Sequence, residues 1–308
     1  MSRILLYYKY VEIEYPGAVA KWHQKVCKEL GLTGRVIIAH EGINGTLGGS
    51  IENTQAYINE LTKDPRFQGI DFKEAQGDAT CFPRLRVVVK DEIVKLGLDT
   101  TKVTVKDTAT HLTPEQFHEL LNKNSEDIVL IDTRNDYESR VGHFNNSLIP
   151  NTKTFREFPE FVEQKKDLLK DKRVLMYCTG GVRCERASSF VKQATEAKEV
   201  YQLEGGIHRY IEQYPNGHFR GSNYVFDARV TARVNNDILG TCDICAQPWD
   251  QYINCTNAFC NKHFICCPDC ILKYEESCGV ECYTKLKNNE VKRRPKPFRS
   301  YTPTTQQL

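Results

Sequence analysis

Two cysteines six positions apart, Cys178 and Cys184, flank a short loop with the sequence TGGVR. The preceding RVLMYC is typical of a buried strand, and the following CERASSFVKQA is typical of a helix. Gly180 and Gly181 let successive backbone amides turn inward as an anion-binding nest, at which the helix directs its positive end. With Arg183 beside it, the Cys178 thiol is predicted to ionise below its usual pKa of about 8.5 and to act as a nucleophile.

The alternative for Cys178 is an inert cysteine that ends a buried strand. An inert cysteine does not need a glycine pair and an arginine in its loop, so the sequence favours the nucleophile. The remaining loop positions are expected to shape the same site. They are Thr179, Val182 and Cys184.

A second group of cysteines lies near the C-terminus, where nine of the 13 in the chain fall between residues 242 and 282. The pairs CDIC and CPDC have the two-residue spacing with which adjacent thiolates chelate one tetrahedral ion. Eight cysteines are expected to form two zinc sites from interleaved pairs, with Cys266 or Cys267 left over. The eight candidate ligands are Cys242, Cys245, Cys255, Cys260, Cys267, Cys270, Cys278 and Cys282. A cluster of free thiols or an iron–sulfur cluster are the alternatives.

The overall charge does not identify a polyanionic partner, because 42 basic residues face 40 acidic ones. The distribution of charge is more informative. Residues 285–299 contain seven Lys or Arg and one acid, Glu290, so residues 285–308 are predicted to be a disordered basic tail that either contacts nucleic acid or only aids solubility. The candidate nucleic-acid contacts are Arg186, Lys192, Lys292, Arg293 and Arg294.

Residues 1–98 are predicted to form a ferredoxin-like, or acylphosphatase-like, α+β domain. ILLYYKYVEI and RVIIA read as strands, PGAVAKWHQKVCKEL and IENTQAYINELTKD as helices, and RLRVVVKDEIV as the closing strand. The glycine-rich HEGINGT either permits a tight turn or holds a phosphate on its backbone amides, and the turn is the simpler interpretation.

Residues 110–221 are predicted to form a doubly wound α/β domain with a parallel sheet. DIVLID, RVLMYC and EVYQLE are buried strands alternating with helices, the first of which begins after Thr113 as an N-cap. Ligands of such folds gather at the carboxyl ends of the strands, where Cys178 lies. Residues 222–284 would form the cysteine-rich module. Asp132 and Arg134 at another strand end are candidates for an ion pair that orients Arg183, or for a purely structural pair.

Three segments in this domain resemble the signature segments of a rhodanese domain: IDTRNDYESRVGHFNNSLIP, YCTGGVRC and LEGGIHRY. Rhodanese-fold phosphatases place five residues between the loop cysteine and arginine, whereas four separate Cys178 from Arg183. The tighter loop favours sulfur chemistry or direct attack by the thiolate over phosphate-ester hydrolysis. With HEGINGT, GSNYVFDARV and the cysteine-rich C-terminal region, the chain resembles the rhodanese-domain tRNA uridine hydroxylases over nearly its whole length.

The resemblance implies an oxidoreductase that forms 5-hydroxyuridine at the tRNA wobble position, with molecular oxygen as co-substrate. It implies that Cys178 is the catalytic cysteine and that the anticodon arm of tRNA is the partner. It does not settle the metal. A rhodanese-type sulfurtransferase carrying a persulfide on Cys178, with Cys184 resolving it, and a noncatalytic RNA-binding adaptor are the competing hypotheses.

The sequence also predicts where the protein works. Its apolar runs are shorter than the roughly 20 residues that span a bilayer, and its start lacks the pattern of a cleaved signal. We therefore expect a cytoplasmic protein with neither a membrane nor DNA as partner. In that compartment thiols stay reduced, so the cysteines are expected to serve catalysis or metal binding.

Overall fold

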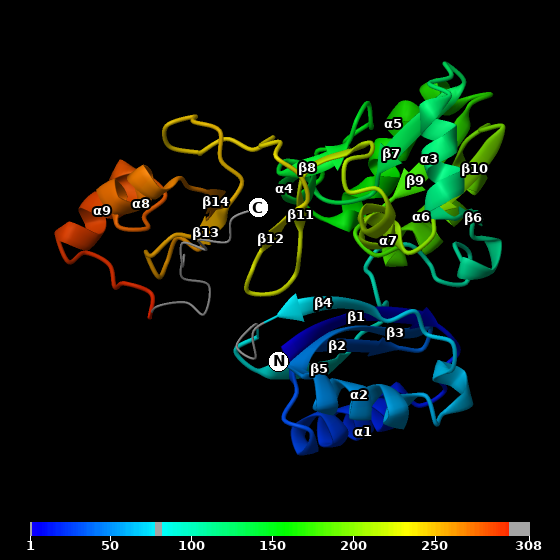
Figure 1. The fold of residues 1–308 in the computed structure, drawn as a ribbon, viewed down its shortest axis with the longest axis horizontal. Coiled ribbons are helices and arrows are strands. Elements are labelled where there is room, and N and C mark those ends of the chain that lie inside the picture. Colours follow the sequence, from blue (N-terminus) through cyan, green and yellow to red (C-terminus); the bar gives the residue numbers. More distant parts are fainter. Residues whose placement is uncertain (1, 78–81, 296–308) are drawn as a thin grey trace. The chain divides into compact units, whose positions relative to one another are not determined.

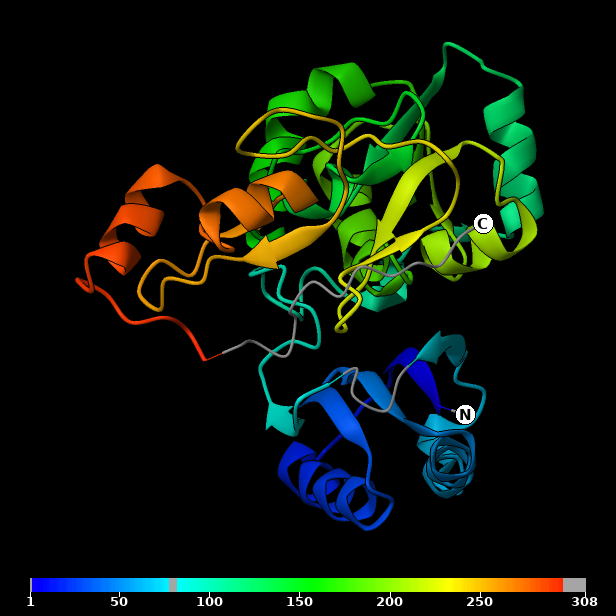
Figure 2. The same cartoon turned by 60° about the vertical axis from the view of Figure 1, so that its left-hand side comes forward.

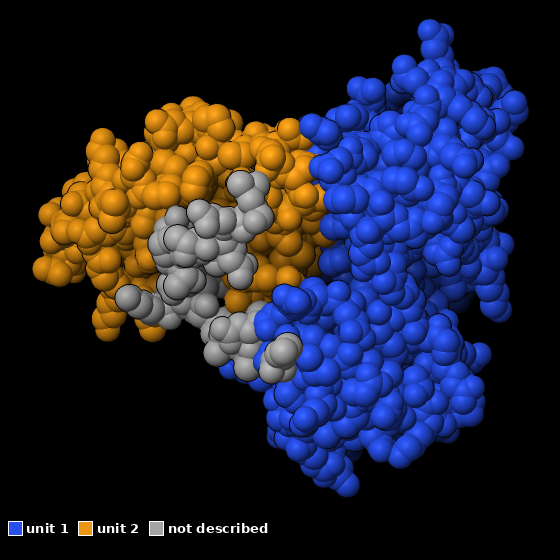
Figure 3. Space-filling view, viewed as in Figure 1, with its two compact units in different colours: residues 1–139, 143–220 blue, residues 140–142, 221–308 orange. Residues whose placement is uncertain are grey.

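The computed structural model describes residues 2–77 and 82–295. They divide into two compact units, one made of residues 1–139 and 143–220 and the other of residues 140–142 and 221–308 (Figure 3). The first unit contains the two N-terminal domains expected from the sequence, each with its own sheet and core. Apart from residues 140–142, the second unit consists of the chain from Gly221 onward, and the cysteine-rich module was predicted from residue 222.

The first domain has a five-stranded sheet in the order β4-β1-β3-β2-β5. Its elements are β1 (Ser2–Tyr10), α1 (Pro16–Glu29), β2 (Thr33–Ala39), β3 (Gly42–Ser50), α2 (Ile51–Leu61), a 3₁₀ turn (Pro65–Phe67), β4 (Lys73–Gly77) and β5 (Leu85–Val89) (Figure 1). The first four strands have the βαββαβ order of a ferredoxin-like domain, which confirms the predicted fold. The strand predicted to close it is β5, which is added in parallel beside β2, whereas the fourth strand is β4.

The glycines of HEGINGT lie in a β-hairpin and not in a phosphate-binding loop. Strands β2 and β3 pair antiparallel from Thr33 opposite Gly48 to Ala39 opposite Gly42. A Cβ on Gly45 would lie 2.3 Å from the Tyr7 ring. Glycine is therefore required for close packing between the strands, and the phosphate interpretation was wrong.

The two faces of this sheet have different roles. Figures 1 and 2 show α1 and α2 together on one face, where Leu5, Tyr7 and Val36 belong to the buried core. Side chains alternate along a strand, so Leu6 and Tyr8 of β1 point to the opposite face. That face contacts the loop after Cys178.

The second domain has four parallel strands in the order β6-β10-β9-β7. Its elements are a 3₁₀ turn (Val105–Asp107), β6 (Thr110–Leu112), α3 (Pro114–Asn122), β7 (Ile128–Asp132), α4 (Asp136–Ser139), β8 (Gly142–Phe144), a 3₁₀ turn (Phe155–Glu157), α5 (Phe158–Leu169), β9 (Arg173–Tyr177), α6 (Val182–Ala194), β10 (Glu199–Leu203) and α7 (Gly206–Gln213). The predicted strands are β7, β9 and β10, and Thr113 caps α3 in a capping box with Gln116. Helices α5 and α6 pack together, as do α3 and α7, which confirms the predicted α/β class.

The C-terminal unit is small and rich in cysteine. Its elements are β11 (Phe219–Tyr224), whose first residues belong to the other unit, and β12 (Thr231–Arg233), β13 (Tyr252–Asn254), β14 (His263–Ile265), α8 (Pro268–Tyr274) and α9 (Val280–Lys287). Its core combines Ile253 and Phe264 with five buried cysteines. Cysteines therefore make up most of the buried side chains of this core, and we expect its stability to depend on them.

The basic tail begins later than predicted. Lys285 and Lys287 lie in α9, and Arg293 forms a β-bridge with Asn257, so residues 285–295 are structured and the predicted disorder was wrong there. Residues 296–308 lie outside the described part of the chain. None of the described helices is long and apolar enough to cross a membrane.

A substitution at Gly45 should show how tightly β1 and β3 pack. Gly45→Ala places a methyl group against the Tyr7 ring and should destabilise the first domain by roughly 1–3 kcal/mol. Gly17→Ala is the matched control because it adds the same methyl to α1, where no atom lies within 4 Å; it should be neutral or stabilising by up to about 1 kcal/mol. Denaturant midpoints would measure both, and equal midpoints would contradict this packing.

Candidate active site

Cys178 directly follows β9 and lies at the carboxyl end of the parallel sheet, as predicted. The Gly181 amide donates a hydrogen bond to the Cys178 Sγ at 3.0 Å. Gly181 has φ +102°, a conformation that a side chain would strain, and this glycine turns its amide toward the sulfur. The amides of Gly180 and Arg183 also donate to this sulfur, so the loop forms the amide nest expected from the sequence.

The charge of Arg183 is fixed by a buried carboxylate. Its Nη1 and Nη2 lie 2.5 and 2.7 Å from the two Glu138 oxygens, and Nη2 also donates to the Thr179 Oγ1 at 3.2 Å. Glu138 comes from α4 and is fully buried. Arg183 is therefore held in place as a local positive charge, with both terminal nitrogens directed at Glu138.

The Cys178 thiol is shifted strongly toward the thiolate. Burial opposes ionisation, but the Cys184 hydrogen bond, the Arg183 charge and the backbone amides outweigh it and lower the pKa of Cys178 from 9.0 to about 5. Cys184 behaves in the opposite way, because burial and the Cys178 charge raise the pKa of its thiol well above the usual value. At neutral pH the pair is one thiolate and one neutral thiol that donates to it.

The first turn of α7 holds the Cys178 loop through backbone hydrogen bonds. The Ile207 and His208 amides donate to the Cys178 and Thr179 carbonyls at 2.9 and 3.1 Å. Gly206 has φ +66°, and a Cβ there would lie 2.5 Å from the Cys178 carbonyl oxygen. The LEGGIHRY segment therefore supports the loop through its backbone. Gly206 must be glycine because a side chain there would collide with the Cys178 carbonyl.

Strands of the first domain cover the loop from the other side. A Cβ on Gly180 would lie 3.1 Å from Leu6, and one on Gly181 would lie 2.8 Å from the Tyr8 hydroxyl. The Tyr8 hydroxyl donates to Glu185 on α6 at 2.9 Å. As a result, Cys178 is 0% exposed in this state of the protein.

Asp132 and Arg134 form the expected ion pair, and its contacts favour the structural one of the roles left open by the sequence. Arg134 Nη2 lies 2.7 Å from Asp132 Oδ2, both side chains are fully buried, and Ser139 also donates to Asp132. The carboxylate that orients Arg183 is Glu138. The pair therefore supports the polypeptide around α4.

Among the candidate RNA contacts, Arg186 is placed unlike the others. It is 1% exposed, forms an ion pair with Glu92 and donates to the Val103 and Leu98 carbonyls. This placement gives Arg186 a structural role, so its proposed RNA contact was wrong. Lys192 and Lys292 are exposed, although the Lys192 ammonium donates to the Asp107 carbonyl at 2.9 Å. Arg293 pairs with Glu275, and Arg294 donates to Asn261.

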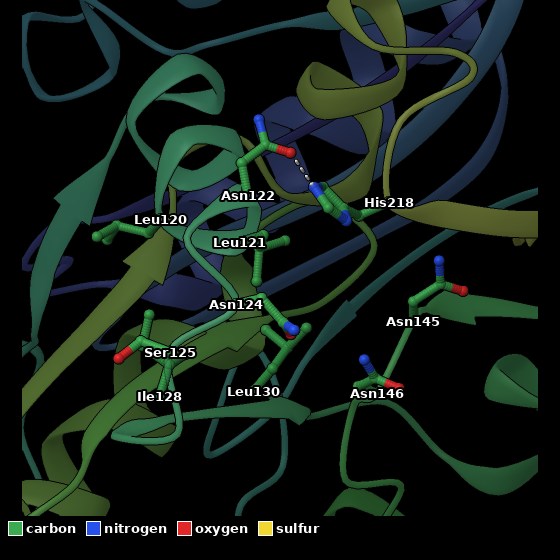
Figure 4. A pocket seen from close by; sticks show the side chains of 10 residues that line it. All are labelled: Leu120, Leu121, Asn122, Asn124, Ser125, Ile128, Leu130, Asn145, Asn146 and His218. Atoms are coloured by element: carbon green, nitrogen blue, oxygen red, sulfur yellow. Dashed lines mark hydrogen bonds between the residues drawn. The ribbon is translucent and has the colours of Figure 1, made fainter.

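A pocket of about 250 Å³ lies at the other end of the parallel sheet (Figure 4). Leu120, Ile128 and His218 are among its lining residues. Ile128 begins β7 and pairs with Arg173 at the start of β9, whereas Cys178 follows the end of β9. The pocket is therefore separate from the Cys178 site.

The cysteine-rich unit brings the eight predicted ligands into two quartets. Cys242, Cys245, Cys267 and Cys270 form one, and Cys255, Cys260, Cys278 and Cys282 form the other. Within each, the sulfur atoms lie within 4.8 Å of one another. The first and third pairs along the chain share a quartet, as do the second and fourth. Cys266 is the cysteine left over.

The spacing of these sulfurs fits a tetrahedral thiolate site. Zinc–sulfur bonds of about 2.3 Å place tetrahedral sulfurs about 3.8 Å apart. The Sγ atoms of Cys245 and Cys267 lie 3.5 Å apart. The Cys278 Sγ lies 3.6 Å from the Cys260 Sγ and 3.8 Å from the Cys282 Sγ. Each quartet could hold one metal ion.

Comparison with known families follows the same division of the chain. The profile of the UPF0176 acylphosphatase like domain matches residues 2–93. The Rhodanese-like domain profile matches residues 113–213, and the Rhodanase C-terminal profile matches residues 220–283. In chain order, the three matches cover the five-stranded sheet, the four-stranded parallel sheet and the cysteine-rich unit.

Three relatives that match over nearly the whole chain share one name. A tRNA uridine(34) hydroxylase of Bacillus velezensis is 42% identical over 296 residues, which cover 94% of this chain and 91% of that protein. The chain belongs to the tRNA uridine(34) hydroxylase family. Proteins of the same name from Cytophaga hutchinsonii and Aster yellows witches'-broom phytoplasma are 42% and 41% identical, covering 91% and 94% of this chain and 89% and 95% of their own lengths.

Three residues near the Cys178 site of this hydroxylase family member were not predicted from the sequence. Glu138 is not identified by the sequence pattern, because nothing in its spacing links it to an arginine 45 residues later. Tyr8 and Lys73 lie in another domain. Leu6 and Tyr8 alternate with core residues along β1, which indicates that they face away from the core of their own domain. This pattern does not indicate what they contact.

The thiolate state of Cys178 can be tested through its neighbour. Cys184→Ala removes a hydrogen-bond donor and should raise the pKa of Cys178 from about 5 by roughly one unit or more. Cys27→Ala, which removes a buried cysteine of the first domain, is the matched control. Thiolate absorbance against pH, measured relative to the same protein with Cys178→Ser, would report the change. A midpoint near that of a free thiol in the unaltered protein would contradict the site geometry.

The metal quartets make a second prediction. Protein purified without added metal should contain two zinc ions, and Cys245→Ser should remove about one of them because a quartet then keeps three thiolates. Cys266→Ser is the control and should retain both. Chelation should unfold the cysteine-rich unit, because binding energy there is folding energy. Metal-free protein with an unchanged circular dichroism spectrum would refute the assignment.

Proposed function

We propose that this protein hydroxylates C5 of the wobble uridine of tRNA, with Cys178 as the attacking thiolate. The observation that carries this proposal is a fully buried thiol whose pKa is lowered to about 5 inside an amide nest. The names of the relatives indicate the substrate and the product of the reaction. The residues of the site indicate its chemical mechanism.

The first step activates C5, which is a poor nucleophile in free uridine. Cys178 Sγ forms a bond to C6 of a uridine turned out of its stack, and the electron pair of the C5–C6 double bond moves onto C5 and the C4 carbonyl. Arg183 and the Gly181 amide hold the sulfur as a thiolate until it attacks. Neither Cys184 nor Arg183 transfers a proton in this step.

The second stage uses molecular oxygen and a dithiol reductant. C5 bonds to one atom of oxygen, and a proton completes a C5 hydroperoxide. The dithiol then takes the distal oxygen as water and becomes a disulfide, which leaves a hydroxyl on C5. Loss of the C5 proton expels Cys178 from C6. In sum, uridine, oxygen and a dithiol give 5-hydroxyuridine, water and a disulfide.

Binding of the anticodon arm is assigned to exposed cations. We retain Lys192 and Lys292, together with Arg293 and Arg294 of the structured segment after α9, as phosphate contacts. The zinc ions would hold the cysteine-rich unit in its fold and take no part in the chemistry. We place the reaction in the cytoplasm, where dithiols are abundant.

The sulfurtransferase alternative remains worth testing because the neutral Cys184 thiol hydrogen bonds to Cys178. Such a thiol could attack a persulfide on Cys178. Incubation with thiosulfate followed by mass spectrometry separates the two functions. Stable gain of one sulfur on Cys178 with turnover to thiocyanate from cyanide would favour sulfur transfer.

The proposed mechanism predicts that replacing the two loop cysteines, Cys178 and Cys184, has very different effects on hydroxylation activity. Cys178→Ser should abolish formation of 5-hydroxyuridine and leave tRNA affinity within a few fold, because the hydroxyl does not ionise near neutral pH. Cys184→Ser should retain activity, since Cys184 forms no bond to the base. Nucleoside analysis of tRNA measures both. With 5-fluorouridine at the target position, a covalent adduct at Cys178 is expected, and turnover without one would overturn the addition to C6.

A further inference from the structure

Lys73 is a lysine in an unusual place. Its side chain is 2% exposed, although lysine is among the residue types least often buried. Its Nζ lies 2.8 Å from Asp71 Oδ2, but that carboxylate is half exposed and also binds Arg209. Asp71 is thus a shared partner near the surface, and the ion pair alone does not account for the burial of the ammonium.

The position of Lys73 relates it to the catalytic loop. It begins β4 directly opposite Leu6 of β1, on the sheet face that covers Cys178. A Cβ on Gly180 would lie 3.9 Å from Lys73 Cδ, and Lys73 Nζ lies 5.5 Å from the centre of the Tyr8 ring. The lysine side chain therefore lies against Gly180 and beside Tyr8, which itself lies against Gly181.

The reaction needs a positive charge that the loop itself does not offer. Arg183 directs both terminal nitrogens at Glu138, and the Gly181 amide donates to the Cys178 sulfur. When the thiolate adds to C6, negative charge develops on the uracil O4, where a preorganised donor stabilises the transition state. Lys73 is the cation that faces the loop from the opposite side.

The closed loop also indicates how Lys73 meets a substrate. Cys178 is 0% exposed beneath Leu6, Tyr8 and Lys73, so a base enters only when the β1–β4 face separates from the loop. When that face closes again over the base, Lys73 faces the base where it now faces Gly180. Closure of this kind completes many active sites and excludes water from them.

We propose that Lys73 is a catalytic and specificity residue whose ammonium donates to O4 of the target uracil and stabilises the oxyanion that forms there. The inference rests on the proposed function. No bond to Lys73 forms or breaks, because it acts as a fixed donor. Cytosine carries an amino group in place of O4 and would set two donors against each other, so the same contact selects uridine over cytidine.

Lys73→Met in the full-length protein tests this role. Loss of one oxyanion donor should lower kcat/KM on a tRNA with uridine at the wobble position by about 100-fold, with tRNA affinity changed by less than about threefold. Lys73→Arg should recover part of the rate because it restores a charged donor. Lys9→Met is the matched control: Lys9 lies on β1 and its ammonium binds the Gln68 carbonyl, so its loss should leave the rate unchanged.

A second substrate isolates the contact from any effect on folding. Replacing the target with 4-thiouridine weakens the acceptor at position 4, which should slow the unaltered enzyme but cost the Lys73→Met enzyme little further. Equal penalties in both enzymes would overturn the proposal, as would a Lys73→Met enzyme of normal kcat/KM or one that loses only tRNA affinity. If Lys73→Met does not fold, Lys73→Leu serves in the same cycle. An unaltered enzyme that forms no 5-hydroxyuridine would instead refute the proposed function.

Discussion

The interaction on which the site depends is the buried pair of charges formed by Glu138 and Arg183. A thiolate with no exposed surface is costly, and the fixed guanidinium next to Cys178 offsets that cost. Removing Glu138 would leave Arg183 without its buried partner, and removing Arg183 would leave Glu138 as an unpaired buried anion. The nucleophile, its counter-charge and the carboxylate that positions it therefore form one electrostatic unit drawn from α4, the loop after β9 and the first turn of α6.

The electrostatic unit of Cys178, Arg183 and Glu138 explains why this loop is not suited to binding a phosphate. Both terminal nitrogens of Arg183 donate to Glu138, and the Gly181 amide donates to the Cys178 sulfur. An incoming phosphate would have to displace these contacts. A neutral uracil needs no such grip, since it must only place C6 against the sulfur and find a donor for the charge that moves to O4.

The sequence predicted the parts of this arrangement that depend on local pattern. Continuous apolar runs identified β7, β9 and β10, the capping residue Thr113 identified the start of α3, and cysteine spacing predicted the pairs within each quartet. The parts that arise from tertiary contact could not be predicted in this way. Nothing in the chain near Arg183 points to Glu138, and β4 lacks the alternating apolar pattern by which a strand is recognised, so Lys73 was not seen. Arg186 was taken for a surface cation because its buried partner, Glu92, is 94 residues away.

The cover provided by the first domain is a consequence of the same electrostatics. A low-pKa thiolate open to solvent is readily oxidised or alkylated, whereas one enclosed by Leu6, Tyr8 and Lys73 reacts only when the cover opens. Enclosure also lowers the local dielectric, which strengthens the attraction between Cys178 and Arg183 and would strengthen that between Lys73 and an oxyanion. A rhodanese-like domain alone would present its loop to water. The ferredoxin-like domain supplies the second wall, and with it the donor that a uracil requires.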